Sequence, residues 1–213
     1  SKFVLQLRFW FLFICLNFNL STNAQTFINF ESGALFTGIN DIRNGNNGTL
    51  FSLKNDFSTS VSPFLRLRAG FLINGEHYFS FLYAPLKIIE SGIREKNILF
   101  DEKDFKANLP IEVVYKFNSY RFTYNRRIII KDNFKFGLGL SAKIRDAGVS
   151  LKNKELLSEN FSIGFVPLIN LLANYDLSQK IGIDFFGEGI IASKGRAIDI
   201  SLSGRYILTE NLQ

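Results

Sequence analysis

Long segments in which apolar and polar residues alternate with a period of two are the feature that most constrains how this chain can fold. The clearest examples are residues 64–73, 134–144 and 197–208. Successive side chains point to opposite faces of a β-strand, whereas the faces of a helix repeat every 3.6 residues. Each of these segments therefore predicts a strand with one apolar face and one polar face.

The same pattern, followed along the chain, predicts eight strands. In residues 111–127 the phase of the pattern changes, because Tyr115 and Phe117 occupy odd positions while Tyr120 and Phe122 occupy even ones. A β-bulge near residues 118–119 would restore a single apolar face. The predicted strands are residues 26–38, 64–73, 77–88, 111–127, 134–144, 161–175, 181–192 and 197–208.

The connections between these strands are alternately short and long. Short turns are expected at 74–76, 131–133, 176–180 and 209–211, and longer polar loops at 39–60, 90–108, 152–160 and 193–196. Tight turns at one end and long loops at the other are typical of bacterial outer-membrane proteins. We therefore predict an all-β fold, an antiparallel up-and-down transmembrane β-barrel.

Alternation does not by itself tell whether the apolar face meets lipid or a soluble core. Strands of ten or more residues match the ~9 to 11 tilted residues that cross a bilayer. Tyr175 and Tyr206 stand just before short turns, where interfacial aromatic side chains belong. A soluble periplasmic ligand-binding β-barrel is the alternative. Residues 206–212 also resemble the turn at 175–181, so we expect a further strand from Leu212 and ten strands in the full-length protein.

Residues 1–24 have the three regions of a secretory signal peptide. Lys2 and Arg8 precede an apolar run at 9–16, and a polar stretch then leads to Ala24. The run is about half the length that a membrane-spanning helix needs. Cys15 fits a lipoprotein signal poorly, since the two residues before it are bulky. We expect cleavage after Ala24, with residues 25–213 forming the barrel domain.

The composition of this expected mature chain excludes several classes of function. It keeps 23 basic and 19 acidic residues, a net charge of +4, without a Lys/Arg-rich run, so we expect no nucleic-acid binding. Loss of Cys15 leaves no thiol, and the chain has one histidine. Thiol nucleophiles and zinc sites rich in Cys or His are thereby excluded. We expect no cofactor and no metal.

Two stretches carry a resemblance to a known group of proteins. Residues 115–121 (YKFNSYR) and 142–147 (AKIRDA) resemble segments of small outer-membrane β-barrel proteins of Gram-negative bacteria, in a poorly characterised exported family. The resemblance implies a monomeric barrel embedded in outer-membrane lipid. It implies no established activity.

His77 and Ser80 are the residues to consider for hydrolytic chemistry, because some outer-membrane enzymes use Ser and His. Residues three apart on a strand point to opposite faces, so these side chains should not meet. His77 also follows a short turn, at the end of the barrel away from the outer leaflet. We therefore predict that the protein is not an enzyme.

The polar face of the predicted barrel carries many charges. In a narrow barrel such charges must be paired or hydrated, which predicts a network of salt bridges that fills the lumen. The alternative is a narrow anion-leaning pore for small solutes. Eight strands leave an interior that side chains just fill and ten leave only slightly more, which argues against a wide channel. The expected lumen-lining residues are Arg66, Arg68, Glu112, Lys116, Arg121, Lys135, Lys143, Arg145, Asp184, Glu188, Asp199 and Arg205.

The long loops are the remaining candidate site. Residues 40–49 crowd Asn and Gly, but they lack the spaced acidic residues of a calcium loop. Long loops on a rigid scaffold commonly carry binding. We therefore predict that loops 39–60 and 90–108 contact an extracellular ligand, in a protein with a structural or surface-recognition role.

Overall fold

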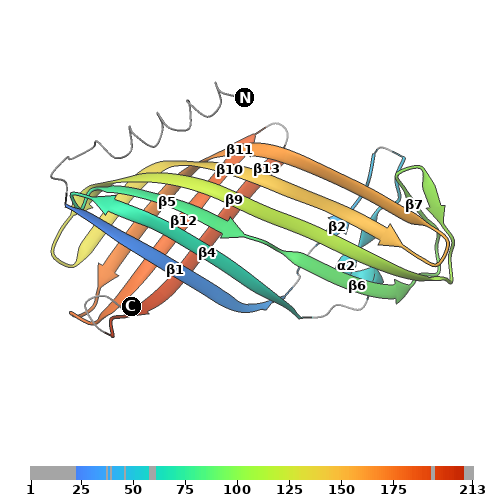
Figure 1. Ribbon diagram of the computed structural model, residues 1–213, viewed down its shortest axis with the longest axis horizontal. Helices are drawn as coiled ribbons and strands as arrows, with labels where there is room; N and C mark the ends of the chain where they lie inside the picture. Colours follow the sequence, from blue (N-terminus) through green and yellow to red (C-terminus); the bar gives the residue numbers. More distant parts are fainter. Residues whose placement is uncertain are drawn as a thin grey trace, which may run out of the picture.

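The main sheet of the computed structural model, which describes residues 23–36, 38, 40–45, 47–57, 61–192 and 195–208, has nine strands, eight of which form an antiparallel meander. Each strand of this meander pairs with the next one along the path (Figure 1). The predicted signal peptide lies almost wholly outside the described residues. Among those residues, no helix is both long and apolar enough to cross a membrane. The strands in order are β1 (Ala24–Leu35), β4 (Ser62–Ile73), β5 (His77–Ala84), β9 (Pro110–Ile130), β10 (Phe134–Lys152), β11 (Leu157–Asp176), β12 (Ile181–Ala192) and β13 (Gly195–Tyr206).

All eight predicted strands are present, which confirms the all-β meander. The turns at 74–76 and 131–133 are also confirmed, and the turn predicted at 176–180 is present one residue shorter because β11 includes Asp176; the turn expected at 209–211 lies outside the described residues. At the first turn, Asn74 and Gly75 both have positive φ, 53° and 71°. Asn-Gly tolerates this geometry, which suits the twist of a hairpin.

Three strands are much longer than alternation indicated. β9, β10 and β11 contain 21, 19 and 20 residues, while β1, β4, β12 and β13 contain 12 each. Figure 1 shows the long strands continuing past the ends of β1 and β4. Part of what the sequence assigned to long loops is therefore a raised extension of the sheet.

The predicted strand at 77–88 is interrupted. β5 ends at Ala84, and β6 (Lys87–Ile93) resumes the pairing with β9 after Pro85 and Leu86. Proline has no N–H to donate to a strand ladder, so pairing breaks there. β6 then covers β9 along the extension.

The bulge predicted near residues 118–119 is wrong. Pairing of β9 with β10 is regular from Glu112 to Arg127, and the register shifts only between Phe136 and Gly137, near the short turn. Even-numbered and odd-numbered residues of β9 therefore keep to their own faces from 112 to 127. The change of phase in the sequence has another cause.

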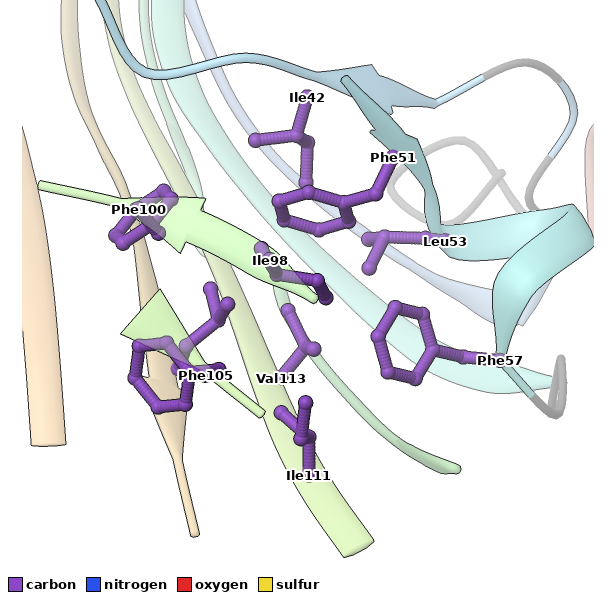
Figure 2. Packing of buried hydrophobic residues seen from close by; sticks show 10 residues of the cluster. Ile42, Phe51, Leu53, Phe57, Ile98, Phe100, Phe105, Ile111 and Val113 are labelled. Carbon is purple, nitrogen blue, oxygen red and sulfur yellow. The ribbon is translucent and has the colours of Figure 1, made fainter. Parts of the chain in front are cut away.

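Five short elements fold against the extension and form what we call the loop head. They lie together at one end of the molecule, with β2, α2 and β7 labelled in Figure 1. Apolar side chains from the head point toward one another and toward Ile111 and Val113 of β9 (Figure 2). The elements are β2 (Asp41–Ile42), β3 (Phe51–Ser52), α2 (Leu53–Asp56), β7 (Ile98–Phe100) and β8 (Lys103–Phe105).

Candidate functional site

Arg121 lies at the centre of the charged face of the sheet. Its guanidinium contacts Glu188 Oε1 at 2.6 Å and Asp199 Oδ2 at 2.9 Å. Arg121 is on β9, whereas its partners are on β12 and β13, and β10 and β11 lie between them in the sheet. Such contacts require the sheet to curl, so that this face is concave. Arg121 and Glu188 are 2% and 5% exposed, and buried charges are tolerated when they are paired in this way.

Neutral polar side chains continue this concave face next to Arg121. Asn125 Nδ2 donates to Asn170 Oδ1 at 2.8 Å, and Asn170 Nδ2 donates to Ser141 Oγ at 3.0 Å. The Ser141 hydroxyl is also 3.2 Å from the hydroxyl of Thr123. All four residues are buried. This part of the concave face is thus a network of polar side chains. Such a network is expected there, since buried polar groups need hydrogen-bond partners.

A second ion cluster lies nearer the short turns. Arg205 contacts Asp176 Oδ1 at 2.6 Å and Asp184 Oδ2 at 3.1 Å. Lys135 Nζ bonds the other oxygen of Asp176 at 2.9 Å, and Asn174 donates to Asp184 at 2.7 Å. The cluster joins β10, β11, β12 and β13 through alternating charges.

Cations on the concave face also contact aromatic rings and a further acidic residue, Glu31. The guanidinium of Arg68 lies 5.3 Å from the ring centre of Phe186, and Lys143 Nζ lies 5.3 Å from that of Phe117. Arg66 pairs with Glu31 of β1 at 3.3 Å. Arg68 is on β4 and Phe186 on β12, strands far apart in the sheet order, so this contact too spans the concavity.

Ten of the twelve residues expected to line a lumen lie on this concave face by strand alternation. Arg145 is among them, and its nearest polar partner is Ser162 Oγ at 3.4 Å. Glu112 and Lys116 were placed there only by the supposed bulge. Since β9 has a regular register, they lie on the opposite, convex face. That the concave face encloses a lumen stays a prediction. The ten are Arg66, Arg68, Arg121, Lys135, Lys143, Arg145, Asp184, Glu188, Asp199 and Arg205.

Sequence reasoning missed several members of these networks. Glu31 and Asp176 are the acidic partners of Arg66 and Arg205. Glu31 could have been assigned to the polar face of β1 from its odd-numbered position, since the apolar Ile28 and Phe30 are at even-numbered positions. Asp176 could not, because it had been assigned to a turn. The amides of Asn125 and Asn170 carry no charge and gave no signal.

The convex face has the opposite character in the lower part of the sheet, which is the part between the short turns and residues 117–119 of β9. Ile28 is 79% exposed, Leu202 is 72% exposed and Phe165 is 67% exposed. Leaving this much apolar surface in water is unfavourable. Other convex side chains exposed in the same way are Phe30, Leu67, Phe71, Phe81, Phe122, Leu138, Leu140, Ile144, Ile163, Ile169, Ile183, Ile198 and Ile200.

The concave face changes from polar to apolar along β9. Arg121 and Asn125 are buried in the lower part, whereas Ile111 and Val113, on the same face, are buried in the extension. The convex face of β9 changes the other way, from the exposed Phe122 to the exposed Glu112, although Ile89 and Ile93 of the neighbouring β6 stay 49% and 63% exposed. We call this change, near residues 117–119, the polarity inversion. It explains the phase change in the sequence without a bulge.

The loop head is held to the extension by hydrogen bonds as well as by apolar packing. Leu99 and Thr49 are linked twice, by Thr49 N to Leu99 O and by Leu99 N to Thr49 Oγ1, both at 2.9 Å. Arg94 pairs with Asp56 at 3.2 Å, and Lys103 Nζ donates to Leu157 O at 2.7 Å. These contacts bring the described parts of loop 39–60 together with loop 90–108.

The residues considered for hydrolysis are separated, as predicted. His77 pairs with Arg126 and Ser80 pairs with Thr123, so their side chains lie on opposite faces of β5. His77 Nδ1 is 3.0 Å from the hydroxyl of Tyr124, with the two rings stacked. In the described part of the chain, no group of three His, Cys, Asp or Glu residues could hold a metal ion.

Comparison with known proteins gives distant structural neighbours. Neither a protein-family model nor a curated protein matches the chain. The chain is similar to the attachment invasion locus protein Ail of Yersinia pestis in complex with the heparin analogue sucrose octasulfate, with 11% identity and a TM-score of 0.45 over 88% of this chain and 99% of that chain. A second Ail structure has 12% identity and a TM-score of 0.41, covering 86% and 96%.

Proposed function

We propose that this chain is a non-enzymatic β-barrel of the bacterial outer membrane, exported by a signal peptide at residues 1–24 that is then cleaved. Ion pairs close the interior of the barrel, and the loop head recognises partners outside the cell. The polarity inversion along β9 carries this proposal. The inner surface of a protein in water is apolar and its outer surface polar. On β9 that arrangement holds between residues 111 and 117 and is reversed between residues 119 and 125.

A change of solvent accounts for the inversion. Lipid chains solvate exposed Ile, Leu and Phe side chains at no cost, while charges avoid them and turn inward. The 12-residue strands β1, β4, β12 and β13 are long enough to cross a bilayer when tilted. The upper parts of β9, β10 and β11 then stand above the membrane, in water.

The orientation follows from the two ends of the sheet. Outer-membrane barrels have short turns on the periplasmic side and long loops on the extracellular side. We assign the turns at 74–76 and 131–133 to the periplasm and the loop head to the cell exterior. Because the head is already folded, its surface is preorganised for recognition, which lowers the entropy cost of binding.

The competing function is the narrow anion-leaning pore. The cations of the concave face favour it, but Arg121 reaches Asp199 and Arg68 reaches Phe186 across the concavity. A barrel of eight or ten strands has little room beyond what its side chains fill. These contacts favour an occluded interior that stabilises the barrel.

Three measurements on the full-length protein test the proposal. We expect it in the outer-membrane fraction, with boiled and unboiled samples migrating differently in detergent gels, and a monomer by light scattering in detergent. In planar bilayers we expect no single-channel conductance. A soluble protein without heat-modifiability would contradict the membrane barrel. Steady anion-selective channels in planar bilayers would contradict the occluded interior and favour the pore.

A further inference from the structure

Four cross-strand pairs on the convex face form a column that changes in character along its length. On β9 the side chains at every second position face the same way, and those of the column lie opposite residues of β5 or β6, with Asn118 between Lys116 and Tyr120. The column begins with two lysines near the polarity inversion and continues with aromatic rings toward the short turns. The pairs are Lys87–Lys116, Tyr83–Tyr120, Phe81–Phe122 and Phe79–Tyr124, and we call them the lipid column.

The lysine end has an excess of positive charge. Like charges placed directly opposite on neighbouring strands repel each other. Lys116 is partly compensated, since its Nζ lies 2.8 Å from Asp146 Oδ2 and 5.8 Å from the ring centre of Phe161. Lys87 is exposed and forms no ion pair within the described residues. An anion between the two lysines would remove the repulsion.

The aromatic part offers an apolar surface beyond Asn118, on the short-turn side of the lysines. The rings of Tyr83 and Tyr120 are stacked, with centroids 5.3 Å apart. Phe81 and Phe122 follow, 49% and 52% exposed. Phe79 lies 4.9 Å from Tyr124 between ring centres. This surface would accept an acyl chain along its length.

The level of the column in the membrane selects the kind of anion. Lys116 is next to Phe117, where the faces of β9 change character, and this is the level of the lipid headgroups if the proposed function holds. Tyrosine rings prefer this interface, and basic side chains there attract anionic headgroups. A lipid places phosphate at that level and hydrocarbon beneath it, matching the order of the column.

We propose that the lipid column binds an anionic, phosphate-bearing lipid of the outer leaflet, with the phosphate between Lys87 and Lys116 and an acyl chain on the aromatic rings. The inference rests on the proposed function, because it needs the convex face to lie in a bilayer. It adds a specific lipid site on one wall of the barrel, outside the loop head.

Native mass spectrometry of the full-length protein in detergent micelles tests this site. Phosphatidic acid and phosphatidylcholine with the same acyl chains serve as probes, since the second carries no net charge. We expect the wild type to prefer phosphatidic acid, with Lys87→Gln reducing that affinity about fivefold and Lys87→Gln with Lys116→Gln reducing it further, as expected for basic groups near an anionic headgroup. Phosphatidylcholine binding should not change.

Lys152→Gln is the matched control, because it removes the same charge from the convex face of β10 outside the column. It should bind phosphatidic acid like the wild type. Lys87→Gln binding phosphatidic acid unchanged overturns the site, as does equal loss in the control. Displacement of the lipid by inorganic phosphate would mean a site for soluble anions instead.

Flotation with liposomes separates this inference from the proposed function. Wild-type protein that floats with liposomes but shows no preference for phosphatidic acid overturns the lipid column alone. Protein that does not float overturns the membrane barrel and the column together.

Discussion

Arg121 and Asp199 are joined by a 2.9 Å ion pair, although their strands β9 and β13 have three other strands between them in the sheet. The same guanidinium also holds Glu188 of β12. One side chain thus ties the first half of the meander to its last two strands. The contact requires the sheet to be curled, which no local propensity of these strands specifies.

Removal of Arg121 should be strongly destabilising. In Arg121→Gln the buried Glu188 loses its cationic partner, and breaking a buried pair costs about 3 to 5 kcal/mol. This change in the free energy of unfolding can be measured by urea titration of the protein in lipid vesicles, with loss of the heat-modifiable band as the readout of unfolding. Arg145→Gln is the control on the same face, because Arg145 is exposed, and it should change the free energy of unfolding by no more than about 0.5 kcal/mol. Equal effects of the two variants would contradict the central role of Arg121.

A charge on the convex face should be costly below the polarity inversion and tolerated above it. Leu138→Arg places a guanidinium on the lower convex face, where Leu138 is 45% exposed, and should cost about 2 to 4 kcal/mol near the bilayer midplane. Glu112→Arg, on the same face of the extension, should be nearly neutral. The free energy of unfolding in vesicles provides the comparison. Leu138→Arg behaving like Glu112→Arg would argue that water covers the whole convex face.

The loop head should loosen without loss of the membrane barrel. Phe100 is 1% exposed in the head, and truncation of a buried phenylalanine costs about 3 to 5 kcal/mol. Phe100→Ala should therefore expose loops 39–60 and 90–108 to an external protease, while the heat-modifiable band persists. Leu50→Ala is the control, since Leu50 is 51% exposed. If Phe100→Ala abolished the folded band instead, head and barrel would unfold as one unit.

Close strand contact should make Gly139 intolerant of a side chain. A Cβ at Gly139 would lie 1.9 Å from Tyr124 O, whereas one at Gly204 would have nothing within 4 Å. Gly139→Ala must push β9 and β10 apart and should cost about 1 to 3 kcal/mol, the usual range for overpacking. Gly204→Ala should be neutral or slightly stabilising. Parallel urea titrations of the two variants decide this, and a neutral Gly139→Ala would show that the strands can separate freely.

The strand pattern could be predicted from the sequence because it is local. Alternation over ten residues fixes which side chains share a face, and Asn74-Gly75 tolerates the positive φ of its hairpin. Parity also placed Arg121, Glu188 and Asp199 on one face. Their partnership was out of reach, since it depends on how far the sheet curls.

The extension and the loop head were missed for a different reason. Ile98 and Phe105 belong to strands of three residues, too short to show a period, and they are buried only because Ile111 and Val113 of β9 lie beneath them. Likewise, the phase change around residues 117–119 has the same sequence signature whether the backbone bulges or the surroundings change. Glu112 and Lys116 were misplaced on that account.

The sequence by itself determined the strands, their order as a meander and the two chemically different faces, because these follow from neighbouring residues and their period. Only the tertiary structure decided which charges meet, as with Arg121 and Asp199, and that the faces of β9 exchange character without a bulge. Those properties arise from contacts between distant segments and from regular pairing along a whole strand, which no local pattern records.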